Sequence, residues 1–533
     1  MQNLYYNGTI LTMEGENDTV EAVLTDQGKI MEAGTLDEVK KAAEPEVHMT
    51  DLQGKTLMPA FIDGHGHITM AAQMSGVADL SECTTFESII LALKDYQKEH
   101  QVTEEGLVFG FGYDHNFLPG GKHPTKEYLN QVSETIPVFI SHTSGHMGCA
   151  NDAALRLAGI TAETANPQGG VIGRVDGSRE PNGYLEEAGM INLQMCMGSR
   201  MKMDVMEAGK KAQALYLQNG ITTVQDGAAT EDTVKMARAW AAAGILKVDI
   251  VAYAMVNSEP QKVLAENEDC VERYVDRFKL GGFKAVLDGS PQGKSAWLTK
   301  PYENSGDYCA YSWFQDEQVE EYMRMAVDSN HQILVHCNGD AAGDQYLRAY
   351  KKALELSHNP NKYNLRPVMI HCQTAREDQL DLMAELKMIP SIFVGHVYYW
   401  GDVHLKNLGE MRGNRISPCR SALDRGLIMN LHQDTPVTKP KMLHSVWCAV
   451  NRITRNGVKL GQEQRISVYE ALKAVTINAA YSYFEEDSKG SIKKGKLADL
   501  VILDQNPMTV DPMKIKDIQV LETIKEGESV YTC

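Results

Sequence analysis

Short apolar runs recur through the middle of the chain and alternate with longer stretches of helical character. The runs lie at 56–62, 222–225, 248–253, 283–287, 332–335, 367–370, 389–394 and 427–431. Strands that alternate with helices are typical of βαβ units around a parallel sheet. Eight such runs over roughly 420 residues predict an α/β protein built on a (β/α)8 barrel that is longer than the usual ~250 residues.

The excess length falls between the first two predicted strands. We expect an insertion there, at about 75–205. It has β-like apolar runs of its own at 107–112 and 136–140, and a stretch near 166–183 that is rich in Gly, Asn and Pro. We interpret this last stretch as a loop, because these residues favour turns.

The two ends of the chain are patterned differently from the middle. Short β-like runs such as 3–6 and 9–13 are separated by turn residues, and the last fifty or so residues behave alike. Each end is too small to bury a core alone, so we expect the two to pair in one small β-sandwich. The predicted organisation is a first sandwich segment at 1–58, the barrel at 59–485 and a second sandwich segment at 486–533.

The composition narrows the class of partner. The chain has 533 residues, with 52 Lys and Arg against 71 Asp and Glu, for a formal net charge of −19. An acidic surface repels nucleic acid and anionic lipid, so we expect a small-molecule substrate and no nucleic-acid or membrane partner. A homodimer is our hypothesis for the assembly.

The compartment is predicted from three absences in the sequence. The chain has no apolar run of eighteen residues, and its start lacks a basic segment followed by an apolar one. Its ten cysteines are scattered without a Cys-x-x-Cys pair, which is typical of reduced thiols. We therefore expect a cytoplasmic protein.

Polar side chains lie in or just after several of the predicted strands. His65 and His67 end the first strand and, being two apart, point the same way. The other members of this set are Lys284, His336, His371 and Asp434. One such residue alone is more often a hydrogen-bonded structural residue. Six at the carboxyl ends of barrel strands converge, and imidazoles with a carboxylate are typical of a zinc-type metal site.

Lys284 is the unusual member of this set, because an ammonium group cannot bind a metal. A neutral amine can react with carbon dioxide to give a carbamate, whose two oxygens can bridge two metal ions, and lysine pKa values fall readily in buried sites. The alternative for Lys284 is an ion pair with Asp288, four residues further on.

These residues carry a resemblance that extends along the whole chain. The sequence resembles the amidohydrolase superfamily and, within it, the YtcJ-like group or amidohydrolase family 3, to which N-substituted formamide deformylase belongs. The segments that carry the resemblance are 59–67, 220–226, 284–290, 336–340, 370–372, 433–436 and 495–500. Each is weak alone, and together they are highly specific.

The resemblance implies a ligand set. His65, His67 and Asp434 would bind a first metal ion, His336 and His371 would bind a second, and carboxylated Lys284 would bridge the two. The cofactors implied are thus two divalent metal ions, with zinc as the expected element, although manganese, cobalt and iron accept such ligands. This chain has His432-Gln433-Asp434 where the family more often has Gly-Ser-Asp, and Pro59-Ala60-Phe61 where it has Gly-Phe. These departures concern loop shape and substrate fit.

The mechanism implied is metal-assisted hydrolysis of a carbon–nitrogen bond other than a peptide bond, in an amide, N-formyl or N-acyl compound. Asp434 would act as the general base and return the proton to the leaving nitrogen. Three alternatives stay open: a lactonase or esterase, a deaminase, and a non-catalytic relative that uses the barrel as a scaffold.

Five further residues are predicted to serve the substrate side of the site. Two lie in the insertion, where a lid would place a phenol or imidazole on the substrate, and one follows the seventh strand. Two others follow a metal-ligand motif and would support it. The five are Tyr113, His146, His396, Asp288 and Asp340. For the residues of the insertion, the alternative is a polar loop whose side chains cap turns.

Overall fold

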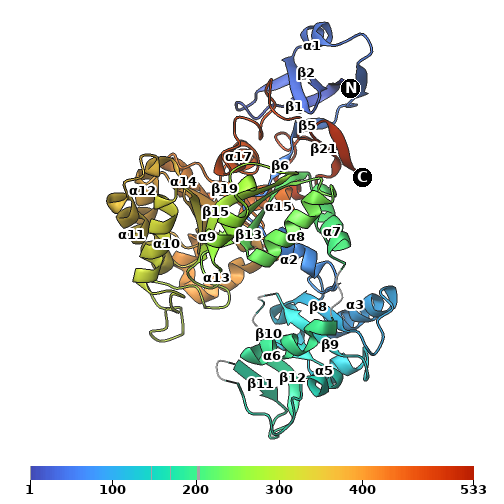
Figure 1. Cartoon of the computed structure of the whole chain (residues 1–533), viewed down its shortest axis with the longest axis vertical. Helices are drawn as coiled ribbons and strands as arrows, with labels where there is room; N and C mark the ends of the chain where they lie inside the picture. The colour runs from blue at the N-terminus through green and yellow to red at the C-terminus, as the bar shows by residue number, and fades with distance from the viewer. Residues whose placement is uncertain (1, 144, 146, 168–169, 201–203) are drawn as a thin grey trace. The chain divides into compact units, whose positions relative to one another are not determined.

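Strands from the middle of the chain form one parallel sheet in the computed structural model, which describes residues 2–143, 145, 147–167, 170–200 and 204–533. The chain divides into two units, one formed by Met1–Thr69 with Gly209–Cys533 and the other by Met70–Ala208. Figure 1 shows the segments coloured along the chain.

The parallel sheet of the first unit has eight strands that pair in chain order. They are β6 (Phe61–Ile62), β13 (Ile221–Ala229), β14 (Asp249–Met255), β15 (Phe278–Val286), β16 (Gln332–Cys337), β17 (Val368–His371), β18 (Ile389–Ile392) and β19 (Asn430–Leu431). All eight predicted runs contribute a strand. The strands are buried along nearly their whole length, as expected of a parallel sheet covered on both faces.

The segments that follow the first and last strands of this sheet meet. The backbone N–H of Asp434 donates to the carbonyl of His65 at 3.2 Å, and that of His67 donates to the carbonyl of Thr435 at 2.8 Å. These bonds bring the carboxyl end of β6 to the carboxyl end of β19, which matters because both ends carry predicted metal ligands.

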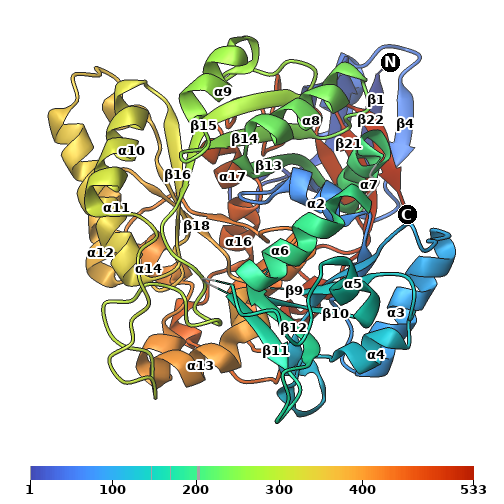
Figure 2. The same ribbon diagram turned by 60° about the horizontal axis from the view of Figure 1, so that its bottom comes forward.

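Helices follow most of the strands. In this unit they are α7 (Val205–Leu217), α8 (Glu231–Ala242), α9 (Pro260–Glu266), α10 (Asp316–Asp328), α11 (Asp340–Leu356), α12 (Glu377–Glu385), α13 (His396–Asn414), α14 (Cys419–Asp424), α15 (Met442–Asn451), α16 (Val468–Ala474) and α17 (Ile477–Ser482). Figure 2 shows α10, α11 and α12 side by side on the outside of the sheet. Among the described residues, no helix combines the length and apolar character needed to cross a bilayer.

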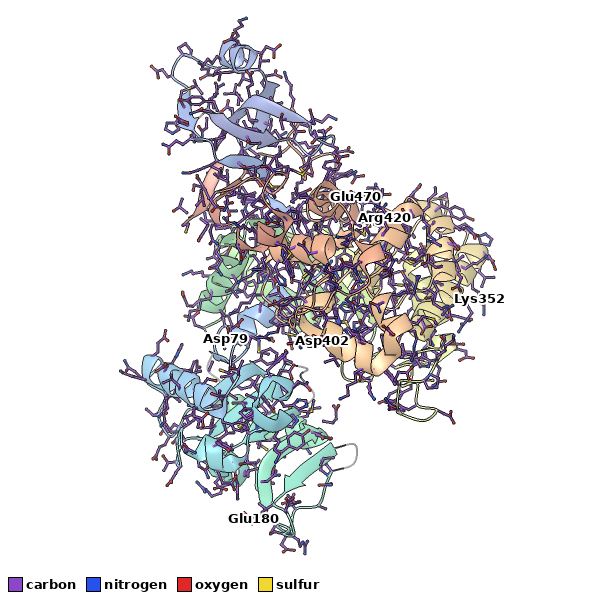
Figure 3. The ribbon with its side chains drawn as sticks, turned by 180° about the vertical axis from the view of Figure 1, so that it is seen from behind. Asp79, Glu180, Lys352, Asp402, Arg420 and Glu470 are labelled. Atoms are coloured by element: carbon purple, nitrogen blue, oxygen red, sulfur yellow. The ribbon has the colours of Figure 1, made fainter. Side chains whose placement is uncertain are left out.

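A capping box precedes α16. The Ser467 hydroxyl accepts from the Glu470 backbone N–H at 3.2 Å, and the Glu470 carboxylate accepts from the Ser467 N–H at 2.7 Å. Glu470 also pairs with Arg420 at 2.9 Å, and both side chains are labelled in Figure 3. This pair ties α14 to the start of α16.

Both ends of the chain enter a second sheet. Its strands are β1 (Asn3–Leu11), β2 (Thr19–Asp26), β3 (Lys29–Gly34), β4 (His48–Asp51), β5 (Thr56–Pro59), β20 (Leu500–Leu503), β21 (Val520–Lys525) and β22 (Glu528–Thr532), with helix α1 (Leu36–Ala42) after β3. Strand β5 joins the two halves, because it pairs with β1 on one side and with β20 on the other. Ile10 and Leu57 share one core with Leu500 and Ile524.

The apolar run 56–62 was predicted to form one strand of the barrel. This prediction is wrong, because the run contributes one strand to each of two sheets. The chain changes partners at Ala60, whose N–H donates to the carbonyl of Asp499 at 2.9 Å, whereas the next N–H, of Phe61, donates to Gly220 at 2.8 Å. One apolar run therefore supplies β5 to the terminal sheet and β6 to the parallel sheet.

The second unit contains a sheet of its own, with the strand order β11, β12, β10, β9, β8, β7. Its strands are β7 (Ala78–Asp79), β8 (Val108–Tyr113), β9 (Val138–His142), β10 (Met147–Ala150), β11 (Gly170–Arg174) and β12 (Pro181–Glu187), and the helices nearby are α2 (Ile68–Met74), α3 (Phe86–Glu99), α4 (Lys126–Asn130), α5 (Asp152–Leu157) and α6 (Ala188–Met197). Successive residues of β8 face different cores: Val108 packs in one and Phe109 in the other.

The stretch 166–183 is not a simple loop, because its described part contributes to β11 and β12. Its glycines permit close strand contact: a Cβ at Gly173 would meet the Asn182 side chain at 2.5 Å, and one at Gly183 would meet the carbonyl of Ala150 at 2.6 Å. Glycine here marks close backbone approach within a sheet as well as turns.

Candidate metal centre

The carboxylate of Asp434 lies at the centre of the predicted metal ligands. Its Oδ1 atom is 3.2 Å from Nε2 of His67 and 3.5 Å from Nε2 of His65, and its Oδ2 atom is 3.8 Å from Nε2 of His371. The ligand atoms of His65, His371 and Asp434 all lie within 4.8 Å of one another. Three imidazoles from two distant parts of the chain thus point at one carboxylate.

Lys284 lies beside this group, near the carboxyl end of β15. Its Nζ is 3.3 Å from Nε2 of His65. Burial lowers the pKa of Lys284 to about 8, although the charges of Asp434 and Cys337 act in the opposite direction. No ion pair joins Lys284 to Asp288, both of which are described, so the alternative of a simple salt bridge is not realised.

His336 is held by Asp288. Nδ1 of His336 is 3.1 Å from Oδ1 of Asp288, and the backbone N–H groups of Asn338, Gly339 and Trp297 also donate to this carboxylate at 2.7 to 3.0 Å. Asp288 is fully buried, and its bonds serve to orient an imidazole. With Nδ1–H donated to Asp288, the lone pair of His336 is on Nε2, which lies 3.3 Å from the side-chain amide nitrogen of Asn338.

A second orienting pair lies behind His371. Its Nδ1 is 3.2 Å from Nε2 of His432, whose Nδ1 is 2.8 Å from the hydroxyl of Ser391. The rings of His336 and His371 lie 4.4 Å apart, centroid to centroid, so His336 adjoins the central group from the His371 side. Sequence reasoning missed His432. The available signal was its place directly before Gln433 and Asp434, at the end of an apolar run.

Strand β13 supplies the support for His65. Oε1 of Gln225 is 2.5 Å from Nδ1 of His65, while its Nε2 donates to the carbonyl of Gly64 at 3.2 Å and to the Tyr483 hydroxyl at 3.0 Å. At Gly227, a Cβ would lie 2.4 Å from Cε1 of His65. Gln225 was also missed as a site residue, because its partners are set by strand register.

The protonation states favour metal binding. Burial, together with the charge of nearby Lys284 and histidines, lowers the pKa of His65 and of His371 well below the usual value, so both imidazoles are neutral at pH 7. Burial acts to raise the pKa of Asp434, but the nearby His67, His432 and Lys284 outweigh it and keep the carboxylate ionised. Neutral imidazoles around a carboxylate are a donor set for zinc and similar ions.

Two observations fit a cation at this place. Oδ1 of Asp434 is buried and has no hydrogen-bond partner among the described residues, although it faces the Nε2 atoms of His65 and His67. His371 and Asp434 also have positive φ angles, of 69° and 56°. Such conformations are costly for residues other than glycine and cluster at functional sites.

Two other predicted residues have partners of their own. His396 begins α13 and is buried, with Nδ1 at 3.0 Å from Nε2 of His404. Asp340 begins α11, where it accepts from the Thr299 N–H at 2.9 Å and pairs with Arg376 at 3.2 Å. Asp340 thus ties a loop and a neighbouring helix to the start of α11.

The remaining two predicted residues, Tyr113 and His146, belong to the insertion. His146 falls outside the described residues. Tyr113 ends β8 and is fully buried, with its hydroxyl 2.9 Å from Nδ1 of His123. A contact of either residue with substrate stays a prediction.

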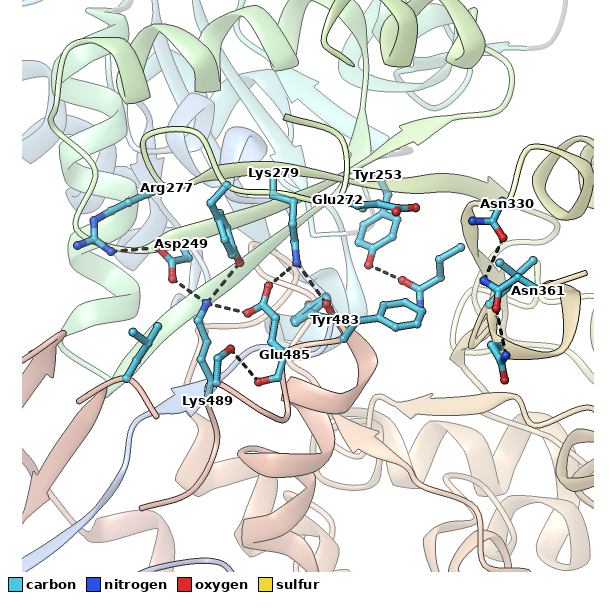
Figure 4. A pocket seen from close by; sticks show the side chains of 18 of the residues that line it. Asp249, Tyr253, Glu272, Arg277, Lys279, Asn330, Asn361, Tyr483, Glu485 and Lys489 are labelled. Carbon is cyan, nitrogen blue, oxygen red and sulfur yellow. Dashed lines mark hydrogen bonds and ion pairs between the residues drawn. The ribbon is translucent and has the colours of Figure 1, made fainter. Parts of the chain in front are cut away.

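A cavity of about 700 Å³ lies at the amino-terminal ends of β14, β15 and β16, away from the strand ends that carry the metal ligands. Figure 4 shows the charged side chains on its walls. Asp249 Oδ2 is 2.7 Å from Lys489 Nζ and 2.6 Å from Lys525 Nζ, and Lys279 pairs with Glu485. Among the described residues that line the cavity there is no histidine, and we interpret the charged side chains as an ion network that joins the carboxyl-terminal segment to the sheet.

The fold is that of metal-dependent hydrolases. The crystal structure of an uncharacterized metal-dependent hydrolase from Pyrococcus horikoshii OT3 superimposes with a TM-score of 0.76 at 23% sequence identity, covering 100% of both chains. A model of the amidohydrolase family matches residues 48–531, and the chain therefore belongs to the amidohydrolase family.

Two relatives match over nearly their whole lengths. The putative amidohydrolase YtcJ of Bacillus subtilis (strain 168) is 26% identical over 545 residues, which covers 100% of this chain and 99% of the relative. The N-substituted formamide deformylase of Arthrobacter pascens is 27% identical over 538 residues, which covers 98% and 97% respectively. The predicted resemblance to this group is confirmed.

Proposed function

We propose that this protein is a metal-dependent hydrolase that cleaves the carbon–nitrogen bond of a small amide, N-formyl or N-acyl compound. The observation that carries the proposal is the convergence of His65, His67 and His371 on the Asp434 carboxylate, with Lys284 beside His65. Family membership and the similarity to N-substituted formamide deformylase support it.

The same proposal assigns the metal ligands. His65, His67 and Asp434 would hold one divalent ion, and His336 and His371 a second, with zinc as the expected element. Lys284 would bridge them after its neutral amine forms a bond to the carbon of CO2 and loses one proton, which gives a carbamate anion. The bound metal would supply Lewis acidity, which lowers the pKa of water from roughly 16 to about 7 and polarises a carbonyl.

Asp434 has the properties of the general base. Its lowered pKa keeps it ionised at neutral pH, and it would accept the proton of the attacking water and donate it to the leaving nitrogen. Amide cleavage needs this second transfer, because an amine leaves only after protonation. Asp288 and His432 would hold the rings of His336 and His371 in the ligating orientation.

We also propose how the parallel sheet closes and how the terminal strands pack. The parallel sheet would close as a (β/α)8 barrel, which the backbone bonds of His65 and His67 to the segment after β19 support. The terminal strands would fold as a small sandwich. Substrate contacts by Tyr113, His146 and His396 would then determine which acyl or formyl compound fits.

A panel of substrates tests the function. Metal-loaded protein is assayed on N-formyl amines, N-acyl amines, lactones and amino-substituted heterocycles, with separate detection of amine, carboxylate and ammonia. We expect release of an amine with formate or another carboxylate. Lactone opening alone would favour the lactonase alternative. Release of ammonia from the heterocycles would favour the deaminase. A protein that neither binds metal nor turns over any of these substrates would favour the non-catalytic scaffold.

Replacement of the base gives a second test. Asp434→Asn should reduce turnover by roughly 10²–10⁴-fold, the range of general-base catalysis, and leave the circular dichroism spectrum unchanged. Asp381→Asn is the control, because Asp381 lies on α12 and pairs with Arg425. Near-normal turnover of Asp434→Asn would contradict the proposed role.

A further inference from the structure

A second cluster of metal-ligating side chains lies within the insertion. Nδ1 of His115 is 3.1 Å from Nε2 of His142, and Oδ1 of Asp114 is 3.8 Å from the first of these atoms and 3.5 Å from the second. All three residues belong to the unit Met70–Ala208, so the geometry is internal to one unit. None of them belongs to the ligand set at the ends of the parallel strands.

The spacing of these three atoms is that of ligands around one ion. In a tetrahedral zinc site, bonds of about 2.0–2.1 Å place neighbouring donor atoms about 3.3 Å apart. The observed separations of 3.1, 3.5 and 3.8 Å lie around this value. An ion could therefore bind with only small side-chain adjustments.

The sheet of the insertion brings the three residues together. Strands β8 and β9 run parallel, with Tyr113 opposite His142, so the residues that follow Tyr113 emerge at the same edge as His142. Asp114 is fixed there, because its Oδ1 accepts from the Asn116 backbone N–H at 2.9 Å and from the Asn116 side chain at 2.8 Å, at the start of the short helix η1 (His115–Phe117).

A third histidine packs against the cluster and is itself held in place. The ring of His123 stacks on that of His115 with centroids 4.2 Å apart. Its Nδ1 bonds to the hydroxyl of buried Tyr113, which also contacts Sγ of Cys149 at 3.3 Å. His123 thus holds the ring of His115 in place by stacking, while its own position is fixed by Tyr113.

The charge of the cluster selects a cation. The carboxylate of Asp114 is ionised, since hydrogen bonds from His142 and Asn116 outweigh the effect of its burial on the pKa. An anion would be repelled by this carboxylate. The side chain of His115 is 26% exposed, which gives an ion access from solvent.

From this geometry we propose that Asp114, His115 and His142 bind one divalent transition-metal ion of the zinc class, at a site additional to the candidate centre of the parallel sheet. Neutral imidazoles and one carboxylate are ligands that zinc accepts, and three protein ligands leave a position for a water or a fourth side chain. The ion would tie β8, η1 and the end of β9 together.

Metal stoichiometry of the full chain tests the proposal. Each protein is dialysed against Zn²⁺ and then metal-free buffer, and zinc per chain is measured by mass spectrometry. The double variant His115→Gln/His142→Gln should hold one equivalent less than the wild type, whereas His65→Gln/His67→Gln should keep the equivalent of the insertion. His100→Gln is the matched control, because His100 is an exposed histidine of the same unit.

A spectroscopic measurement separates this site from the proposed active site. In the His65→Gln/His67→Gln background loaded with Co²⁺, the visible d–d absorption of the insertion site should persist and should disappear when His115→Gln is added. Because His115 is partly exposed, this substitution leaves the buried core intact, and circular dichroism verifies the fold. Equal zinc content in the wild type and the folded double variant would overturn the proposal, as would an anomalous map of zinc-soaked crystals without a peak at these residues.

Discussion

Gln225 Oε1 lies 2.5 Å from Nδ1 of His65, and this contact fixes which nitrogen of His65 faces the candidate metal centre. Oε1 can only accept, so Nδ1 carries the proton and Nε2 keeps its lone pair toward Asp434. The Nε2 group of Gln225 is itself bonded to Gly64 and Tyr483, which holds the amide in this orientation.

Replacing Gln225 by leucine should therefore weaken metal binding without removing a ligand. Loss of an orienting partner typically reduces metal affinity by roughly 10–100-fold, and we expect a change of this size in Zn²⁺ affinity measured by competition with a chelator. Gln213→Leu is the matched control, since Gln213 is a buried glutamine whose bonds, to Ile245 and Lys247, lie in another part of the unit. Equal affinities for the two variants would contradict an orienting role.

Gly227 gives a steric test of the same ligand. A methyl group there would lie 2.4 Å from Cε1 of His65 and 2.8 Å from Oε1 of Gln225, so Gly227→Ala must displace the imidazole. We expect Gly227→Ala to bind less zinc and to lose turnover by at least tenfold. Gly198→Ala is the control, because its Cβ would meet nothing within 4 Å and its φ of −55° suits alanine. If Gly227→Ala binds as much zinc as the wild type, the prediction is wrong, because His65 can then move away from the added methyl group and still bind the metal.

The sequence was sufficient to predict the parallel sheet and the ends of its strands. Strands buried on both faces appear in the sequence as continuous apolar runs, and polar residues in or just after several of these runs, such as Lys284 and His371, mark the edge where ligands meet. The grouping around Asp434 follows from this rule, because parallel strands place all their carboxyl ends on one side.

The sequence was insufficient wherever a residue's partner depends on three-dimensional register. Residues 56–62 divide between two sheets because successive backbone N–H groups donate to different strands. An apolar run in the sequence does not indicate which strand each N–H will bond to. Gln225 and His432 look like ordinary strand residues until the strands are aligned. The cluster at Asp114, His115 and His142 was also missed, because parallel pairing of β8 with β9 brings together residues that are far apart in the sequence.

Lys284 gives a prediction that does not depend on the substrate. Burial lowers its pKa to about 8, so a substantial fraction of the amine is neutral at pH 8 and can react with CO2. Metal loading from CO2-free buffer should therefore be slower and less complete than loading with added bicarbonate. Metal content is measured by mass spectrometry after each treatment. Equal loading with and without bicarbonate would contradict carboxylation.

A variant and its chemical rescue extend this test. Lys284→Ala should bind less of the second metal ion and lose activity, and acetate or propionate in the buffer should restore part of both by supplying a carboxylate where the carbamate would lie. Lys279→Ala is a comparison on the same strand, because Lys279 pairs with Glu485 at the opposite end of β15. Its activity should not respond to acetate.

Asp249 holds two buried lysines at the amino-terminal end of β14. Its Oδ2 atom is 2.7 Å from Nζ of Lys489 and 2.6 Å from Nζ of Lys525, and Figure 4 shows Asp249 and Lys489 on the wall of the cavity. Both lysines come from the carboxyl-terminal segment, so this carboxylate fastens that segment to the parallel sheet. A buried charge that loses its partner is strongly destabilising, by about 3 kcal/mol or more.

Asp249→Asn should therefore lower the free energy of unfolding by about 3 kcal/mol at pH 7, measured by urea denaturation. Burial acts to raise the pKa of Asp249, but the two lysines outweigh it and lower the pKa below the unfolded value of about 3.9. The contribution of Asp249 to stability is thus fully present above about pH 4 and is lost as the pH falls through the lower pKa of the folded state. The difference in free energy of unfolding between wild type and variant, which we call the gap, should therefore narrow only below about pH 4.

Lys352→Gln, which breaks an exposed pair with Glu320, is the control and should leave the unfolding curve unchanged. A gap that already narrows between pH 7 and pH 5 would show that Asp249 is not held in its ionised form by these lysines.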